Sequence, residues 1–560
     1  MAFERRRSQR QKVWVAFLCA WAACAGETRF ALREPLRVDP DIRPFAPAPE
    51  EYVSPFAWDG ADQMVFRPIA NFFAVDPAGR AANVNAYDEV ANSSWFENRI
   101  GRAPLSAAEI IAGPCGDAVL DPNQPGASWL IDKGKANGAN PGFRVNVPGL
   151  GKFMLKADPD GEPERATGAT AIAARIYHAA GYFAPCDSVV YFDPSILQLA
   201  PGLRVTDNSG VTRAFDGSML AALLEHASHR GTLVRMGASR WLPGKPLGPS
   251  RYEGTRSDDP NDAIAHEDRR ELRGARLLAA WLNHFDSREQ NSMDVFMSVA
   301  PDSKREFGYV RHYILDLGDC FGSVWSSQEL SKRLGFAYYL DFPYLVEDFV
   351  SAGFIERPWE RARRDAGIFN YFSARDFDPE AWRGGYPNPA FVRMTEADGA
   401  WMARIIARFG AEQIAAAVSV GQFDAASSEY LTRTLLARRR AILQRYLTRL
   451  SPWADLQLNA NQLCGVDLAR ATGVASSARP PSARVRGAAG WQPVSNTAIS
   501  LDTNHQLCLR LTPHARGSSA KAPEYVVLEV DTGSARSVLR AHLYDLGPSQ
   551  GYRLVGIERD

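Results

Sequence analysis

The chain has 560 residues, of which 46% are hydrophobic and 23% charged, and its 64 basic and 64 acidic side chains give a formal net charge of +0. This length predicts two to four domains, and the composition is that of a folded globular protein rather than a disordered one. Because the charges balance, the chain lacks the basic excess that binds a nucleic-acid backbone, and we expect no nucleic-acid partner.

The first 26 residues have the layout of an export signal, with a basic cluster over residues 5–12, an apolar run over residues 13–23, and small residues after it. As a helix the apolar run rises only about 16 Å, too little for the roughly 30 Å of a bilayer core, so we expect cleavage. Residues 21–24 (WAAC) resemble a bacterial lipoprotein box, although Trp21 stands where Leu or Val is usual. The resemblance implies lipidation of Cys24 and a membrane anchor. Plain secretion is the alternative, and both imply export.

Few cysteines remain beyond this signal, too few for a disulfide scaffold, so the fold must rest on a hydrophobic core. A bridge between the two C-terminal cysteines is one candidate, but a buried free thiol is the simpler expectation for all of them. These cysteines are Cys115, Cys186, Cys320, Cys464 and Cys508.

Residues 27–124 are expected to form an irregular arm with one short helix. The segment before residue 95 is rich in Pro, Asp and Phe and has no sustained periodicity. Further on, Ser106 and Glu109 form a capping box that opens a helix ending near Gly113.

Strand signals follow between residues 129 and 192. Residues 129–132, 143–147 and 152–157 predict three antiparallel strands, with a Gly- and Asn-rich loop over residues 133–142 between the first two. Residues 165–180 predict a helix closed by Gly181, and residues 187–192 predict a further strand. A helix over 218–226 and a strand over 232–242 complete this region.

The next elements surround two short polar motifs. A predicted helix over residues 267–282 leads into the segment HFDSREQN at 284–291, and a predicted hairpin over 293–315 leads into ILDLG at 314–318. Helices dominate residues 328–450, including one capped by Thr395 and Asp398 and one over 430–450, where Arg438 is expected on a solvated face. After residue 452, short alternating strands predict a small β domain over 453–560, with a flexible loop at 475–490.

The two motifs carry residue types suited to phosphoryl transfer, in which the protein mainly supplies positioning and charge. Asp286 and Asn291 are separated by four residues and follow His284, the spacing of the base and the metal-binding amide in a kinase catalytic loop. Asp316 begins an Asp-Leu-Gly segment similar to the metal-binding Asp-Phe-Gly element, and Asp319 is the second candidate ligand. Alone, each motif also fits an ordinary loop.

Upstream residues supply the other expected parts of the site. Lys156 lies on the predicted strand 152–157, where a kinase places the lysine that contacts the phosphates. Glu164, just before the following helix, is its expected ion-pair partner, with Glu162 as the alternative. The loop expected to cover the phosphates contains Gly134, Gly138 and Gly142, whose spacing is not Gly-x-Gly-x-x-Gly.

The joint order of these parts resembles the atypical kinases, namely the HipA-type, CotH-type and type II phosphatidylinositol 4-kinase families, over about residues 125–450. The resemblance implies an α+β, bilobal protein-kinase-like fold, with an antiparallel-sheet N-lobe and hinge over 125–262 and a helical C-lobe over 263–452. It also implies a phosphotransferase that uses ATP with Mg²⁺ or Mn²⁺ and an acceptor, protein or small molecule, that the sequence does not name. Phe285 replaces the Arg through which kinases respond to a phosphorylated activation loop, so we expect no such control.

Export argues for one alternative, because a bacterial envelope compartment holds little ATP. This alternative is a catalytically inactive kinase-fold scaffold or binding lipoprotein of the envelope. A separate hypothesis drops the kinase and takes the chain as a surface adhesion or carbohydrate-associated protein that binds through its C-terminal β domain. Retention of Lys156, Asp286, Asn291 and Asp316 favours activity. The polar segment 256–267 either contacts substrate or caps the following helix, and capping is the expectation.

Overall fold

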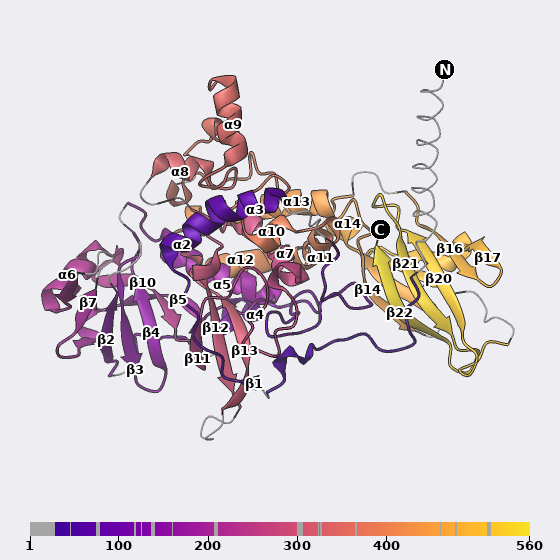
Figure 1. Cartoon of the computed structure of the whole chain (residues 1–560), viewed down its shortest axis with the longest axis horizontal. Coiled ribbons are helices and arrows are strands. Elements are labelled where there is room, and N and C mark those ends of the chain that lie inside the picture. Colours follow the sequence, from indigo (N-terminus) through magenta and orange to yellow (C-terminus); the bar gives the residue numbers. More distant parts are fainter. Residues whose placement is uncertain are drawn as a thin grey trace, which may run out of the picture.

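The computed structural model of the chain describes residues 28–559 except for short segments at 45, 74–78, 117–118, 125, 136–139, 160, 207–210, 300–305, 323, 325–326, 365–366, 460, 476–478 and 512–516. The predicted export signal with Cys24, and Gly138 of the glycine-rich loop, lie outside the described residues. Figure 1 shows a sheet at one end of the molecule, helices in the middle and the C-terminal sheets at the other end. The protein is therefore a mixed α+β chain with several sheets.

A seven-stranded sheet forms the first end, with strand order β5-β10-β4-β3-β2-β6 and β9 paired to β10. Its strands alternate apolar and polar residues, and the apolar face buries Phe143, Phe153 and Leu155 in one core. The five strands predicted from the sequence are confirmed, one with the predicted bounds and the others with shifted ends: β2 (Trp129–Lys135), β3 (Gly142–Val147), β4 (Gly151–Lys156), β5 (Asp187–Phe192) and β10 (Leu233–Arg240). The sequence did not predict the short strands β6 (Leu197–Leu199) and β9 (His229–Arg230), nor β7 (Arg204–Thr206) and β8 (Thr212–Ala214), which lie nearby with α6 (Gly217–His226).

Helix α5 (Arg165–Ala180) connects β4 to β5 and is buried along almost its whole length. Its many alanines favour a helix and leave room for close packing on every side. Gly181 ends it at φ +131°, where an added Cβ would lie 2.2 Å from the Phe96 ring. This helix, with the bounds predicted from the sequence, joins the sheet to the helical body.

A second sheet, in the order β1-β13-β12-β11, contains the predicted hairpin. Its register pairs Ser292 with Ile314, and the backbone N–H of Leu315 donates to the carbonyl of Asn291 over 2.8 Å. The end of one motif and the start of the other are therefore adjacent at the open end of the hairpin. The strands are β1 (Ala46–Pro47), β11 (Lys245–Gly248), β12 (Ser292–Ser298) and β13 (Phe307–Ile314).

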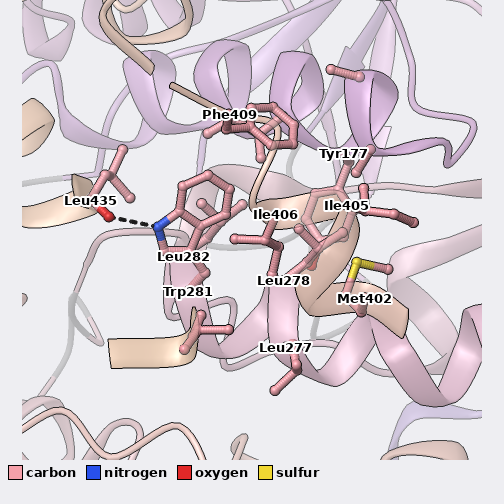
Figure 2. Packing of buried hydrophobic residues seen from close by; sticks show 14 of the residues in the cluster. Tyr177, Leu277, Leu278, Trp281, Leu282, Met402, Ile405, Ile406, Phe409 and Leu435 are labelled. Atoms are coloured by element: carbon pink, nitrogen blue, oxygen red, sulfur yellow. Dashed lines mark hydrogen bonds between the residues drawn. The ribbon is translucent and has the colours of Figure 1, made fainter. Parts of the chain in front are cut away.

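The helical body packs around one large apolar core, part of which Figure 2 shows. Trp281 lies fully buried at its centre, and its indole N–H donates to the Leu435 carbonyl over 2.8 Å, so the ring is buried without an unpaired donor. The main helices are α7 (Arg270–Leu282), α11 (Glu396–Ile406), α12 (Ala411–Ser419) and α13 (Ala425–Tyr446), with α8 (Gln328–Arg333), α9 (Phe342–Ser351) and α10 (Pro389–Val392). Short 3₁₀ turns are η4 (Pro194–Ile196), η5 (His266–Asp268), η6 (Glu289–Asn291), η7 (Leu317–Asp319), η8 (Pro358–Arg361) and η9 (Gly367–Phe369).

The N-terminal arm contains more helix than the sequence predicted. The capping box of Ser106 and Glu109 is confirmed at the start of α4 (Ala107–Ala112), but a helical stretch between residues 56 and 73 was missed. Its Pro-rich flanks and lack of an apolar stripe gave no periodic signal. The arm also contains η1 (Pro40–Ile42), α2 (Phe56–Ala61), the π-helical turn η2 (Asp62–Phe66), α3 (Arg67–Phe73) and η3 (Gly113–Cys115).

The C-terminal part consists of two antiparallel sheets that share a core including Trp453 and Leu463. The prediction of a flexible loop over 475–490 was wrong in part, because the strand β16 (Ser482–Gly487) lies within it. One sheet has the order β14-β15-β19-β18 and the other β17-β16-β20-β21-β22. The elements are β14 (Trp453–Asn459), β15 (Gln462–Asp467), α14 (Leu468–Ala471), β16 (Ser482–Gly487), β17 (Gly490–Pro493), η10 (Asn496–Ala498), β18 (Ile499–Leu501), β19 (Gln506–Arg510), β20 (Glu524–Asp531), β21 (Leu539–Asp545) and β22 (Tyr552–Arg559).

Arg438 corrects another expectation, since it lies buried rather than on a solvated face. Its guanidinium donates to the carbonyls of Trp281, Ala280 and Ser373, which leaves it surrounded by backbone acceptors. Burial lowers its pKa to about 9. Among the described residues, no helix combines the length and the apolar character needed to cross a bilayer.

The cysteines also differ from expectation, because two disulfides form and Cys320 alone of the described cysteines is free and buried. The Cys464–Cys508 bridge joins directly paired residues of β15 and β19. The Cys115–Cys186 bridge joins the N-terminal arm to the residue before β5 and was not predicted. Sequence spacing carries no signal for it, since only the fold brings these cysteines together.

Breaking the Cys115–Cys186 bridge is expected to lower the free energy of unfolding by about 2–4 kcal/mol, because it closes a loop with a sequence separation of 71 residues. Denaturant unfolding of the Cys115→Ser, Cys186→Ser double variant against the parent protein measures the loss. A variant lacking Cys464 and Cys508 serves as the comparison. Unchanged stability in the first variant would contradict a constraining role for the bridge.

Candidate functional site

Lys156 and Asp316 meet although 160 positions separate them in the sequence, with Lys156 Nζ 2.8 Å from Asp316 Oδ1. Lys156 is the last residue of β4, and Asp316 follows the end of β13. Asp316 has the left-handed backbone conformation, φ 52° and ψ 53°, which is uncommon for a residue with a side chain and concentrates at functional sites. The two predicted motif residues therefore face each other between the sheet and the hairpin.

This ion pair shapes the titration of both groups. The Lys156 ammonium lowers the pKa of the Asp316 carboxyl below its ordinary value, against the opposing effect of burial. Burial pulls the pKa of Lys156 down, but the Asp316 carboxylate outweighs it and holds the pKa above its ordinary value. Both groups are thus charged at neutral pH.

A second lysine that the sequence interpretation missed lies beside this pair. Lys135 is in register with Gly142, and Gly142 is in register with Lys156, so the two lysines flank a glycine on one face of the sheet. Burial, and then the Lys156 charge, lower the pKa of Lys135 to about 8. Its Nζ donates to the Asn140 carbonyl over 2.6 Å. The only sequence signal for it was its position on the strand before the glycine-rich loop.

Two of the predicted loop glycines are required by packing. A Cβ at Gly142 would lie 2.1 Å from the Leu155 carbonyl oxygen, and a Cβ at Gly134 would lie 2.7 Å from the Phe215 ring. Gly142 thus keeps the space between the two lysines free of any side chain. Gly134 lies within β2, so its closeness to Phe215 is a matter of core packing.

Glu164 does not form the expected ion pair with Lys156, which is bound to Asp316 instead. It is the residue before α5, at φ 64°, where its backbone N–H donates to Asp158 and Ser228 side chains. The alternative, Glu162, binds Arg165 with a 2.6 Å contact. Spacing along the chain could not identify the partner of Lys156, because Glu162 pairs with Arg165 at the start of α5 and Asp316, far away in sequence, takes the lysine.

The catalytic-loop motif forms a compact hydrogen-bonded unit. Asn291 Nδ2 donates to the Asp286 carbonyl over 2.7 Å and to Asp286 Oδ2 over 3.0 Å, while Arg288 Nε lies 3.1 Å from Asp286 Oδ1. Burial raises the pKa of the Asp286 carboxyl, and the neighbouring Asp319 adds to that rise, whereas Arg288 opposes it. A half-buried carboxyl with a raised pKa, held in place by an amide, suits general-base chemistry.

Asp319 connects the two motifs. Its Oδ2 accepts the Asp286 backbone N–H over 2.9 Å, and its Oδ1 lies 3.6 Å from His284 Nε2. His284 in turn lies 2.9 Å from the Tyr177 hydroxyl on α5, and burial lowers the pKa of His284 to about 4, so it is neutral. Asp319 therefore holds the Asp286 loop, a role that the sequence interpretation did not assign to it.

Phe285, expected from the sequence to replace a kinase Arg, is a packed residue of its loop. It is buried, its ring packs edge-on against Tyr339 at 6.4 Å, and its carbonyl accepts the Gly385 N–H over 2.6 Å. The position is part of a packed contact between the loop and the helical body.

A cavity of about 300 Å³ lies against this site. Lys156, Asp316 and Gly318 line one part of it, and apolar side chains line most of the remainder. Residues of β4, β10 and the hairpin contribute to its walls, so it opens between the sheet and the helical body. A concave, largely apolar pocket with a few charged groups is the usual form of a small-molecule site.

The donor set beside the cavity suits a hard divalent cation. Within the described part of the chain, no three His, Cys, Asp or Glu side chains converge as a complete cage. Mg²⁺, however, is commonly held by one or two carboxylates together with phosphate oxygens and water. Asp316, at the cavity, and the Asn291 amide oxygen fit that pattern; Asp319 accepts a backbone N–H at Oδ2, while its Oδ1 has no hydrogen-bond partner within the described part of the chain.

The polar segment over residues 256–267 supports the hairpin rather than the cavity. Arg256 Nη1 lies 3.1 Å from Asp294 Oδ2, and Asp294 Oδ1 lies 2.6 Å from His312 Nδ1 across the β12–β13 pair. His266, in the same segment, bonds Asp262 over 2.8 Å. These buried contacts fix the strands that position Asn291 and Asp316.

Comparison with known proteins adds little to this geometry. No protein-family model matches the chain, and no curated protein matches it. Among solved structures, the chain is similar to the crystal structure of the Golgi casein kinase, with 12% sequence identity over 50% of this chain and 72% of that one, at a TM-score of 0.20.

Proposed function

We propose that this chain is an exported, lipid-anchored phosphotransferase with a bilobal protein-kinase-like fold. The observation that carries the proposal is the contact between Lys156 and Asp316 at the wall of a cavity, next to the Asp286–Asn291 unit. Of the four residues chosen from sequence motifs, two thus meet at the cavity and the other two form a hydrogen-bonded pair in the neighbouring motif. The sheet of β2, β3, β4, β10 and β5, with α5 between β4 and β5, forms the proposed N-lobe.

In this proposal the chain's own residues divide the work of the transfer. Lys156 and Lys135 bind the phosphates of a nucleoside triphosphate such as ATP, and Asn291 keeps Asp286 oriented. Asp286 accepts the proton of the acceptor hydroxyl at one carboxylate oxygen, each of which has lone pairs left after bonding Asn291 and Arg288. A Mg²⁺ or Mn²⁺ ion held by Asp316 and Asn291 would supply charge neutralisation of the phosphates.

The proposed compartment has support from the disulfides. Two bridges in the described chain are typical of proteins that fold in an oxidising environment, as an exported protein does. Lipidation at Cys24 remains a proposal from the sequence. The acceptor, protein or small molecule, is the open part of this function.

A nucleotide with Mg²⁺ or Mn²⁺ is expected to raise the melting temperature of the full chain, because a ligand at about 100 times its Kd stabilises a protein by roughly 2.7 kcal/mol. Asp316→Ala should lose the metal-dependent part of this shift while melting cooperatively. Thermal unfolding with ATP, GTP and each metal, alone and combined, measures it. The absence of any shift in the parent protein would favour the inactive scaffold instead.

A further inference from the structure

Asp187 is a buried carboxylate on the cavity wall that has no part in the proposed phosphoryl transfer. It opens β5, is only 2% exposed, and lines the cavity together with Lys156 and Asp316. Within the described part of the chain, neither of its carboxylate oxygens makes a hydrogen bond of normal geometry, although the Ser239 hydroxyl lies close enough to lower the pKa of the Asp187 carboxyl. Burying carboxylate oxygens without hydrogen-bond donors lowers the stability of the fold. A ligand that donates to these oxygens would explain why the carboxylate is there.

The strand register places Asp187 toward one end of the cavity. Asp187 is directly opposite Ser239, and Ser239 is directly opposite Met154, so the three side chains share one rung on one face of the sheet. All three line the cavity. The rung of Lys156 is two residues further along β4, on the side away from the segment that follows β10.

The lining of the cavity near Asp187 is mostly apolar but includes one more charged residue. Pro185, Trp241 and Leu242 are near neighbours in sequence of Asp187 and Ser239 and line the cavity, and so does Arg240, which follows Ser239 on β10. A nucleotide with its phosphates at Lys156 would therefore place its base against these apolar side chains, Arg240 and the Asp187 carboxylate.

The charges around Asp187 come from several elements. Burial raises its pKa to about 7 and the Asp316 carboxylate adds to the rise, while Ser239, Lys156 and Arg175 oppose it. The Arg175 guanidinium donates to the backbone carbonyl of Asp187 and not to its carboxylate. Near neutral pH, a ligand that supplies two N–H donors would keep this side chain ionised.

We propose that Asp187 recognises the nucleobase and that the cavity prefers a guanine nucleotide to an adenine nucleotide, an inference that rests on the proposed function. A carboxylate presents two acceptors side by side, and the pairing edge of guanine presents two N–H donors side by side. Adenine offers an amino donor next to a ring nitrogen whose lone pair would face a carboxylate oxygen. A polar group left unpaired in this way discriminates strongly between ligands.

The test compares dissociation constants of GTP, ITP, ATP and XTP for the full chain with Mn²⁺. GTP is expected to bind about 10–100-fold more tightly than ATP, the range typical of one good bidentate contact, and ITP, which lacks the second donor, should lie between them. Asp187→Asn presents one donor and one acceptor, which match the edge of xanthine. This variant should therefore bind XTP better than GTP.

The melting temperature of the protein without nucleotide shows whether Asp187 serves binding or only stabilises the fold. The raised pKa means that the folded chain binds a proton more tightly than the unfolded chain, so this group costs stability as pH rises from about 4 to about 7. Asp187→Asn removes that cost, and its melting temperature should equal or exceed the parent's at pH 8. A lower melting temperature there would overturn the inference.

The binding outcomes are equally decisive. ATP binding as tight as GTP binding, unchanged by Asp187→Asn, overturns this inference and leaves the phosphotransferase proposal standing. No binding of any nucleotide overturns both. The comparison of GTP, ITP and ATP binding to the parent protein needs no variant. A folding defect in Asp187→Asn therefore cannot hide the base preference.

Discussion

Asp286→Asn is expected to lower the rate of phosphoryl transfer by about 10²–10⁴-fold, the usual contribution of a general base, while nucleotide binding stays near the parent value. Asn keeps the shape of the side chain and its contact with Asn291 but accepts no proton. Its amide also cannot form the ion pair with Arg288, which lies 3.1 Å from the carboxylate in the parent. Turnover and Kd, measured separately, should therefore respond differently.

The measurement follows the release of phosphate from a nucleoside triphosphate, or its incorporation into the chain, because the acceptor is not identified. Asp193→Asn is the matched control, since Asp193 is exposed and outside the cavity lining. Equal turnover in Asp286→Asn and the parent would remove Asp286 as the base. A parallel fall in affinity would instead indicate a disturbed loop, as expected for Asp319→Asn, which loses a carboxylate acceptor of the Asp286 N–H.

Local patterns in the sequence predicted the regular elements near the site well. The helix over residues 165–180 and the strand over 187–192 have the predicted bounds, because an alanine-rich segment favours a helix and a segment of valine and aromatic residues favours a strand. The hairpin between the two motifs was also confirmed. Each of these elements depends on neighbours close in the chain, which periodicity can detect.

What depends on register and on distant contacts could not be predicted. Lys135 joins Lys156 only because both strands align on Gly142, and Asp187 faces the cavity only because β5 aligns on β10. In the sequence, Asp187 opens a strand and resembles any polar strand end. The predicted ion pair between Lys156 and Glu164 was wrong, because closeness in the sequence does not determine where a side chain points.

Buried charge was the other feature that the sequence did not reveal. Arg438 lies in a helix whose arginine run resembles a solvated face, yet backbone carbonyls of α7 surround it. A guanidinium has five donors and can be buried wherever carbonyls converge. From sequence alone, arginines are assigned to the surface. Buried ion pairs and buried arginine contacts can therefore be identified only once the structure is known.

One such buried network holds the three parts of the chain together, with Asp88 of the N-terminal arm at its centre. Asp88 Oδ1 lies 2.6 Å from Arg270 on α7, and Oδ2 lies 2.7 Å from Arg559 on β22 and 3.3 Å from Arg404 on α11. Together these arginines lower the pKa of the Asp88 carboxyl, although burial opposes them. A single carboxylate thus compensates buried charge from the helical body and the C-terminal domain.

Asp88→Asn is expected to lower the free energy of unfolding by about 3–5 kcal/mol, the cost of leaving buried charge uncompensated. Arg404 keeps Glu89 and Arg270 keeps Asp398, but within the described part of the chain Arg559 retains only the Trp453 carbonyl. Asn tolerates the φ of 57° at this position, so backbone strain does not contribute. Denaturant unfolding at pH 7, followed by hydrogen exchange on β22, measures the loss.

The sign of the pH dependence provides a second check on Asp88. A carboxyl with a lowered pKa in the folded state contributes stability above its unfolded pKa of about 4, and that contribution is lost as pH falls toward the folded pKa. The unfolding free energies of the parent and of Asp88→Asn should therefore converge in acid.

The control variant is Glu429→Gln, which breaks an exposed pair with Arg433 at 3.2 Å and should lower the free energy of unfolding by at most about 0.5 kcal/mol. If Asp88→Asn lowers the free energy of unfolding no more than this control does, Asp88 does not hold the domains together. If adding Arg559→Met to Asp88→Asn restores much of the lost stability, the unpaired guanidinium was the cause of the loss.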